Sequence, residues 1–578
     1  MKWGIKMTKL SALPIAAACV LIAAATVLGA TPDTRVASGS PPSPFSQNKQ
    51  NEPAIAVDAH APNVLVAGSN DEIDEQGCDG SRCPFTAGIG VSGVYFSFDS
   101  GQTWIQPTYT GWSARHCLGG PCTPHVGPIG TLPFYFENGL VADGDPGVAF
   151  GPRLVNGKFT WAGGSRLYYS NLTSNFSSGP ANEVFNGFEA IAISRTDHVA
   201  AAAASDKSAW MPPVVISRQS GTTFSDKEQV WADNASSSPF FGNVYVCWAR
   251  FQGQEKGRAA PAQLQIAVSS DGGDTWTEHP IGAAANNGQN NPLDGCTVRT
   301  GNDGTAYVFG IGTNSSSGKG GFELMSTSTN GGQNWSNPTP VAGPVTQPGL
   351  FDPVLGRPTI DGIAGARSDL APAPSVDIAN GAPTGSDATN RIVMSYVSGT
   401  IDQQHVFFTE SADGGSTWST PRAVEANAGD HGYYTAPAIS PNGTDVYVVY
   451  NAFTTPYRHN TTDPRSLVGV VVHADVSGGS TGAFSELHRG ASGDPRGSAQ
   501  NNLKGEFLGD YVYATATRNY GAAVWNDARN DADCPAVDAW RMSLRTGGSV
   551  AKPAPLAVCP ATFGNSDIYG GAFADPTP

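Results

Sequence analysis

Charged and aromatic side chains recur at the start of seven short apolar runs along the chain. Carboxylates at such positions could act as a general acid and base, cations could bind an anionic group, and tyrosines could stack on a ligand or attack it. If the seven runs are equivalent strands, these side chains meet around one axis. The set consists of Glu52, Asp145, Asp226, Lys227, Glu228, Asp294, Arg357, Tyr434, Asp510 and Tyr511.

Four residues of this set are predicted to be catalytic. Glu52, Asp145 and Asp510 would supply the acid and the base, and Tyr511 would be the nucleophile once a nearby carboxylate takes its proton. We expect Arg357 to hold an anionic group. The other predicted substrate-binding residues are Lys227, Glu228, Asp294, Tyr434 and, from a long loop at 526–538, Arg529. The structural alternative is a solvated rim in which Asp510 fixes a strand end and Tyr511 packs against a neighbouring sheet.

The composition points to an all-β fold. The chain has 578 residues, with 70 Gly, 43 Pro and only 14% charged residues, which excludes a coiled coil. The apolar runs begin near positions 53, 146, 228, 296, 358, 437 and 511, and each unit has room for about four strands. Sequential four-stranded units predict a single β-propeller of seven blades, with six blades plus a closing element as the alternative. The innermost strands of a propeller begin at one face, so the candidate residues should line one mouth.

An eight-residue phrase of the form S-x-D-x-G-x-T-W supports this repeat. Its aspartate or asparagine can bond back to the turn amides, its glycine can take a positive φ, and its tryptophan can pack between sheets. Each copy follows a β-rich run, so each is predicted to be a hairpin turn at the periphery. The copies lie at 97–104, 269–276, 328–335 and 411–418.

This phrase resembles the Asp-box of the sialidase-like (BNR-repeat) β-propeller superfamily, and the resemblance spans roughly residues 51–545. It implies a secreted bacterial sialidase-family protein, that is, an exo-α-sialidase or a related glycosidase acting on a carbohydrate. Known sialidases hold the substrate carboxylate with three arginines, the first in an Arg-Ile-Pro motif. This chain contains no Arg-Ile-Pro, and the superfamily includes non-catalytic members. The alternative function is therefore a secreted propeller that binds a polysaccharide or a protein without catalysis.

The first thirty residues have the pattern of a secretory signal peptide. Lys2, Lys6 and Lys9 precede an apolar run that ends in small residues near Ala30. We expect a signal peptide at 1–30, a linker at 31–50, the propeller at 51–545 and an extension at 546–578. The net charge of −16 argues against a nucleic-acid partner. After removal of the leader, we expect an extracellular monomer with no membrane attachment.

Eight cysteines remain once the leader is set aside, and an even number in an exported chain indicates disulfides. Proximity and the repeat register favour the pairs Cys78–Cys83, Cys117–Cys122, Cys247–Cys296 and Cys534–Cys559. The alternative for one pair is a small zinc site made of His116, Cys117, Cys122 and His125.

No cofactor is predicted to be required, and the ligands of any metal are unknown. The loop at 526–538 carries Asp527, Asp531 and Asp533, whose oxygens could hold a structural Ca²⁺. The loop lacks the fixed glycine and the terminal glutamate of an EF-hand, so its spacing alone is weak support.

Overall fold

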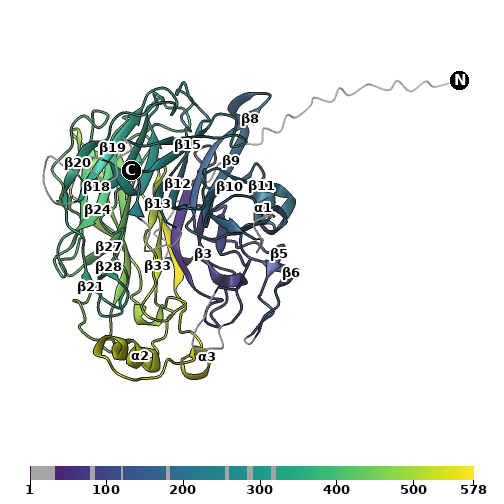
Figure 1. Ribbon diagram of the computed structural model, residues 1–578. Coiled ribbons are helices and arrows are strands. Elements are labelled where there is room, and N and C mark those ends of the chain that lie inside the picture. The colour runs from purple at the N-terminus through teal and green to yellow at the C-terminus, as the bar shows by residue number, and fades with distance from the viewer. Residues whose placement is uncertain are drawn as a thin grey trace.

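The computed structural model describes Met1 and residues 33–77, 85–118, 121–176, 183–253, 260–282, 291–313 and 321–577. The predicted signal peptide and the predicted Cys78–Cys83 pair lie outside the described residues. Figure 1 shows sheets that follow one another around the molecule, from purple at the N-terminus to yellow at the C-terminus.

Seven antiparallel sheets form a seven-bladed β-propeller, as the repeat predicts. Blade one contains β2 (Gln50–Val57), β3 (Leu65–Asp71) and β4 (Ser92–Ser97). Blade two contains β7 (Leu140–Ala142), β8 (Gly147–Val155), β9 (Lys158–Asn175), β10 (Ala190–Thr196) and β11 (Trp210–Val215). Blade three contains β12 (Thr223–Ala232), β13 (Val244–Gln252), β14 (Ala260–Pro261), β15 (Gln265–Ser269) and β16 (Thr277–Pro280).

Blades four, five and six are built in the same way, with the first strand of each blade nearest the axis. Blade four contains β17 (Pro292–Thr300), β18 (Ala306–Thr313), β19 (Gly321–Ser328) and β20 (Thr339–Val345). Blade five contains β23 (Ser375–Ile378), β24 (Ile392–Ser398), β25 (His405–Ser411) and β26 (Arg422–Ala423). Blade six contains β27 (His431–Ile439), β28 (Asp445–Phe453), β29 (Leu467–Ser477), β30 (Ser480–Thr481) and β31 (Ser485–Arg489).

Blade seven is built from both ends of the chain. Its strands are β32 (Tyr513–Ala516), β33 (Tyr520–Asp527), β34 (Asp567–Ala574) and β1 (Thr34–Arg35), in that order. The ring therefore closes through the pairing of β1 with β34. Both strands lie outside the range 51–545 expected from the sequence, so the propeller extends into the segments interpreted as a linker and an extension.

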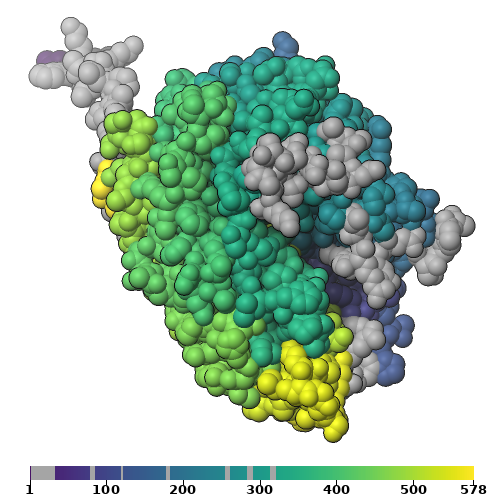
Figure 2. Space-filling model, turned by 60° about the vertical axis from the view of Figure 1, so that its left-hand side comes forward, coloured from purple at the N-terminus to yellow at the C-terminus, as the bar shows by residue number. Residues whose placement is uncertain are grey.

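In the part of the chain that the structure describes, two hairpins and three α-helices lie outside the blade sheets. The hairpins are β5 (Tyr109–Ser113) with β6 (His125–Ile129) and β21 (Leu350–Asp352) with β22 (Arg357–Thr359). The helices are α1 (Val199–Ala203), α2 (Pro535–Thr546) and α3 (Pro555–Val558). Figures 1 and 2 both show the yellow residues of α2 and α3 at the lower end of the molecule. Among the described residues, no helix has the length and apolar character needed to cross a membrane.

The four Asp-box phrases form tight turns after the third strand of a blade, at the periphery. In blade three, Gly273 N donates to Ser269 Oγ (2.8 Å) and Thr275 N donates to Asp271 Oδ1 (3.0 Å). Gly273 has a φ of +90°, which suits glycine, and its carbonyl accepts from Trp276 Nε1 (3.0 Å). The phrase therefore closes an outer hairpin and lies away from the axis.

One of the seven predicted inner strands is wrong. The run beginning at Arg357-Pro358 forms β22, which pairs with β21 in a separate two-stranded sheet, and the inner strand of blade five is β23. The prediction fails because Arg357-Pro358-Thr-Ile has the same opening as the true inner strands. The four-residue strand β23 lies within a stretch rich in Pro, Ala and Gly.

Three predicted disulfides are confirmed. They are Cys117–Cys122, Cys247–Cys296 and Cys534–Cys559. The zinc alternative is wrong, because the two sulfur atoms that it requires are bonded to each other. Cys247–Cys296 joins β13 of blade three to β17 of blade four, and Cys534–Cys559 joins the start of α2 to the end of α3.

Candidate functional site

The same backbone distortion recurs where the inner strands of the first four blades begin. Glu52, Asp145, Lys227 and Gly295 have φ values of +57°, +54°, +60° and +61°. Register shifts accompany three of them, between Asn51 and Ala54 in β2, between Asp226 and Gln229 in β12, and between Asp294 and Thr297 in β17. A positive φ is uncommon for residues other than glycine, and a bulge re-aims a side chain. The repeated distortion brings the side chains of Glu52, Asp145 and Lys227 together.

Lys227 is the centre of a buried ion network contributed by several blades. Its Nζ lies 2.8 Å from Asp145 Oδ2, 2.7 Å from Asp510 Oδ2 and 3.5 Å from Glu52 Oε1. The Lys227 side chain is 9% exposed and the Glu52 side chain is 1% exposed. Burying four charged groups is costly unless they are paired, and here each carboxylate faces a cation.

A second cation, Arg367, closes the network from the segment that precedes β23. Its Nε donates to Asp510 Oδ1 (2.8 Å), and one terminal nitrogen contacts Glu52 Oε1 (3.2 Å). The same terminal nitrogen also donates to Asp510 Oδ2, so Nε and Nη2 together bind the Asp510 carboxylate in a bidentate manner. Arg367 is not among the residues predicted from the sequence, because it lies in a segment that does not repeat and is followed by an undetected strand.

Helix α2 holds the chain that leads to Asp510. Arg541, which is fully buried, donates to the carbonyl oxygens of Leu503 (3.0 Å), Ser498 (3.1 Å) and Gly505 (3.1 Å). Tyr434 Oη then donates to Asp510 Oδ1 (3.1 Å). The position of Asp510 therefore depends on the C-terminal helix as well as on blade six.

The pKa values of Glu52 and Asp510 are shifted in opposite directions. Burial and the neighbouring Asp145 carboxylate raise the pKa of Glu52 well above its usual value, and Glu52 shares a side-chain hydrogen bond with Asp145. Burial also disfavours the charged form of Asp510, but Arg367 and Lys227 outweigh it and hold that pKa well below its usual range. The environment thus favours the protonated form of Glu52 and the ionised form of Asp510.

Tyr511 lies against this network without a hydrogen bond to it. Lys227 Nζ is 5.7 Å from the centre of the Tyr511 ring, and the Tyr511 hydroxyl has no hydrogen-bond partner among the described residues. Burial, Asp145 and Glu52 raise the pKa of the hydroxyl well above 10. A tyrosine nucleophile needs a lowered pKa or a base in contact, and neither is present for Tyr511 among the described residues, so its catalytic role stays a prediction.

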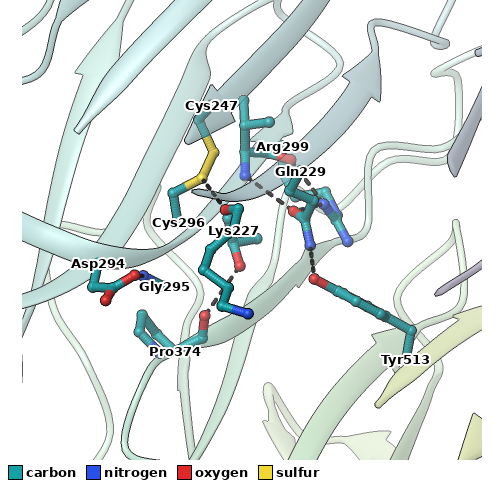
Figure 3. Close-up of a disulfide and its surroundings, with 11 residues drawn as sticks. Lys227, Gln229, Cys247, Asp294, Gly295, Cys296, Arg299, Pro374 and Tyr513 are labelled. Carbon is teal, nitrogen blue, oxygen red and sulfur yellow. Dashed lines mark hydrogen bonds between the residues drawn. A yellow bond between two sulfur atoms is a disulfide. The ribbon is translucent and has the colours of Figure 1, made fainter. Parts of the chain in front are cut away.

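Glu228 and Asp294 lie close to the network. Burial and Asp145 raise the pKa of Glu228 well above its usual value, while burial and Asp226 raise the pKa of Asp294 to about 7. Figure 3 shows Asp294 and Gly295 on one side of Lys227 and the Cys247–Cys296 disulfide above it. The disulfide thus fixes the blades from which these side chains come.

Two predicted binding residues do not join the network. Arg357 pairs with Asp369 (3.2 Å), and both side chains are partly exposed. Arg529 binds Asp527 and Asp33 and lies 3.9 Å from the ring centre of Tyr569, within blade seven. The expected convergence thus holds for Glu52, Asp145 and Asp510, and Arg367 takes the place expected for Arg357.

In the loop considered for calcium, two aspartates pair with arginines and the carboxyl group of a third is buried. Asp527 Oδ1 accepts from Arg529 Nε (2.8 Å), and Asp533 lies 3.3 Å from Arg496. Burial, Asp567 and Asp527 raise the pKa of Asp531 well above its usual value. Calcium at this loop stays a prediction.

The channel along the axis has two hollows. One, of about 50 Å³, lies beside the network and is lined by Lys227, Glu228, Tyr434, Asp510 and Tyr511. The other, of about 200 Å³, lies at the opposite ends of the inner strands, around Arg299 and Trp231. Figure 3 shows Arg299, Gln229 and Tyr513 in a hydrogen-bonded chain beyond Lys227.

A scan against models of protein families and a search of curated proteins find no match for the chain. Similar solved structures include the intramolecular trans-sialidases of leech (14% identity, 74% of this chain and 67% of that chain covered, TM-score 0.39) and Ruminococcus gnavus (12%, 73% and 94%, 0.38). Another is a protein of unknown function from Dyadobacter fermentans (10%, 74% and 93%, 0.37). These values carry no argument about activity, and the propeller rests on the seven sheets themselves.

Proposed function

We propose that this protein is a glycan-acting hydrolase of sialidase-like type, with Glu52 as its general acid. The observation that supports the proposal is the pair of opposite pKa shifts within one buried network, raised at Glu52 and lowered at Asp510. Groups whose pKa values are pushed apart are the ordinary basis for assigning acid and base in glycoside hydrolysis. Glu52 would protonate the leaving oxygen, and Asp510, which Arg367 and Lys227 keep ionised, would be the partner carboxylate.

The charge balance of the site favours a neutral sugar over a sialoside. Lys227 and Arg367 are the cations of the network, and both already contact Glu52 and Asp510. A substrate carboxylate would have to compete with these internal carboxylates for the same two cations. We therefore expect neutral glycans to be hydrolysed in preference to sialosides.

The size of the hollow supports a second candidate function, a propeller that binds a glycan without cleaving it. A volume of about 50 Å³ is small beside the roughly 300–1,000 Å³ of typical ligand pockets, so it favours a single protruding group of a ligand. Hydrolysis would require the buried Glu52, which is not among the residues that line this hollow, to reach the substrate, whereas binding of a single protruding group would not.

The three confirmed disulfides and the N-terminal pattern together support a place outside the cytoplasm, where disulfides persist. The expected partner is accordingly an extracellular or periplasmic carbohydrate.

The test is a hydrolysis and binding screen over neutral glycans and sialosides, with Glu52→Gln as the main variant. If Glu52 is the acid, turnover of the best substrate falls about 10²- to 10⁴-fold while its Kd changes little. Glu72→Gln is the matched control, because Glu72 is also buried, has a raised pKa and pairs with a lysine, Lys49 (2.9 Å). Full turnover by Glu52→Gln overturns the catalytic assignment, and binding without any turnover supports the second candidate.

A further inference from the structure

A histidine and three aspartates gather where blade six meets the end of blade seven. Asp445 begins β28, His473 and Asp475 lie on β29, and Asp575 directly follows β34. His473 Nε2 is 3.3 Å from Asp445 Oδ1, 3.9 Å from Asp475 Oδ1 and 4.0 Å from Asp575 Oδ1. One donor atom of each residue lies within 4.8 Å of the donors of the other three.

The strand register makes this group unfavourable without a cation. Asp445 and Asp475 are direct cross-strand partners in the β28–β29 ladder, and like charges in such a pair destabilise a sheet. Asp575 adds a third carboxylate, brought by the C-terminal end of the chain. His473 is 3% exposed, so its ring nitrogen meets these charges out of contact with bulk water.

A buried tyrosine points to a ligand at the same place. The Tyr447 ring lies 4.9 Å from the His473 ring, and Tyr447 is 1% exposed. Its hydroxyl has no hydrogen-bond partner among the described residues. Tyr447 is the cross-strand partner of His473 and lies two residues from Asp445 on β28, so its side chain projects from the same face of the sheet as the cluster. A hydrated ion would supply the missing partner.

We propose that Asp445, His473, Asp475 and Asp575 bind one divalent transition-metal ion, with Zn²⁺ as the best fit, and so fasten the C-terminal end of blade seven to blade six. Ligands of a tetrahedral zinc ion lie about 2.1 Å from the metal and hence about 3.4 Å from one another. The observed separations from Nε2, 3.3–4.0 Å, need only a small contraction. Calcium prefers oxygen ligands alone, so the imidazole favours zinc.

Neighbouring threonines orient the carboxylates, as outer partners of metal ligands commonly do. Thr444 Oγ1 donates to Asp445 Oδ2 (2.5 Å), and Thr577 N donates to Asp575 Oδ1 (2.8 Å). Thr577 Oγ1 also donates to Asp475 Oδ1, so the last residues of the chain bridge two of the proposed ligands.

The test is calorimetric titration of the chelator-treated protein with ZnCl₂, together with melting curves in zinc and in calcium. We expect one zinc site per chain whose affinity falls at least 10-fold in His473→Gln and in Asp475→Asn, and a melting temperature that zinc raises. Asp475→Asn is less apt to disturb the fold than His473→Gln, because the Asp475 side chain is 52% exposed. Asp463→Asn, an exposed aspartate elsewhere in blade six, is the control and should bind zinc normally.

X-ray absorption at the zinc edge should show about four nitrogen or oxygen neighbours and the outer-shell scattering of one imidazole ring in the wild type. The proposal is overturned if the wild type binds no zinc stoichiometrically, if binding persists in both variants, or if calcium is preferred at these residues. This test is independent of any glycan hydrolysis.

Discussion

Lys227 shows how much of the site depends on one buried cation. Glu52, Asp145 and Asp510 all approach its Nζ within 3.5 Å. Desolvation works against its charge, but the surrounding carboxylates outweigh it and raise the pKa of Lys227 well above its usual value. This ammonium is the cation that all three carboxylates share, and Arg367 adds a second positive charge next to Glu52 and Asp510.

Replacing Lys227 by methionine should therefore be strongly destabilising. The change leaves buried carboxylates without their common partner, a loss of about 3–5 kcal/mol in the free energy of unfolding. Urea unfolding of Lys227→Met, compared with the exposed-site control Lys158→Met, measures it. A loss below about 1 kcal/mol would show that the network tolerates the missing charge.

Tyr511 offers a second experiment at the residue scale. Because its hydroxyl has no partner among the described residues and a raised pKa, we expect Tyr511→Phe to keep its melting temperature and to keep turnover within a few-fold of the wild type. The measurement is the turnover of Tyr511→Phe and of the wild type on any substrate found in the glycan screen. Abolished turnover in a folded variant would restore the tyrosine-nucleophile hypothesis and contradict the acid–base assignment to carboxylates alone.

At the scale of the element, the connection between β12 and β13 contains a buried carboxyl. Asp233 is fully buried, accepts a hydrogen bond from Ser238 Oγ (2.5 Å), and has a pKa raised to about 7, chiefly by burial. Between about pH 4 and pH 7 the folded state keeps this proton while the unfolded state loses it. Stability from this group is therefore present at low pH and is lost as the pH rises towards 7.

The pH dependence can be isolated with Asp233→Asn. From pH 5 to pH 7 the wild type should lose roughly 2–3 kcal/mol of stability relative to the variant, because holding one proton through each pH step of 1 costs about 1.4 kcal/mol. Denaturant unfolding at several pH values gives the difference. Parallel stability curves for the two proteins would mean that Asp233 is ionised in the fold.

Sequence patterns predicted elements well where a local signal repeats. The inner strands β2, β8, β12, β17 and β27 follow the predicted openings, and the Asp-box turns lie where their phrase places them. Strand β23 was missed because four residues in a Pro- and Gly-rich stretch carry almost no periodic signal. Arg367 was missed for the same reason, since its partners are distant in sequence and the chain around it has no repeat. The pairing of β1 with β34 likewise leaves no local trace.

At the scale of the whole molecule, the disulfide between blades three and four is expected to limit unfolding. Cys247 and Cys296 are separated by 49 residues, and closing a loop of that length stabilises a protein by about 4 kcal/mol in the chain-entropy model. The double variant Cys247→Ala/Cys296→Ala should lose stability of that order in guanidinium unfolding.

The matched comparison is Cys117→Ala/Cys122→Ala, which opens a loop of separation 5 and should lose only about 2 kcal/mol. Equal losses from the two double variants would argue that local packing, and not loop closure, sets the effect.

The pairing of β1 with β34 can form only late in synthesis of the chain. A ribosome adds about 5–20 residues per second, so β1 waits roughly 30–110 s before its partner strand has been made. During that interval the ring is open and β1 has no partner strand, and an unpaired strand edge is prone to wrong pairing. Nascent chains should therefore depend on chaperones until β34 emerges, however stable the finished ring is.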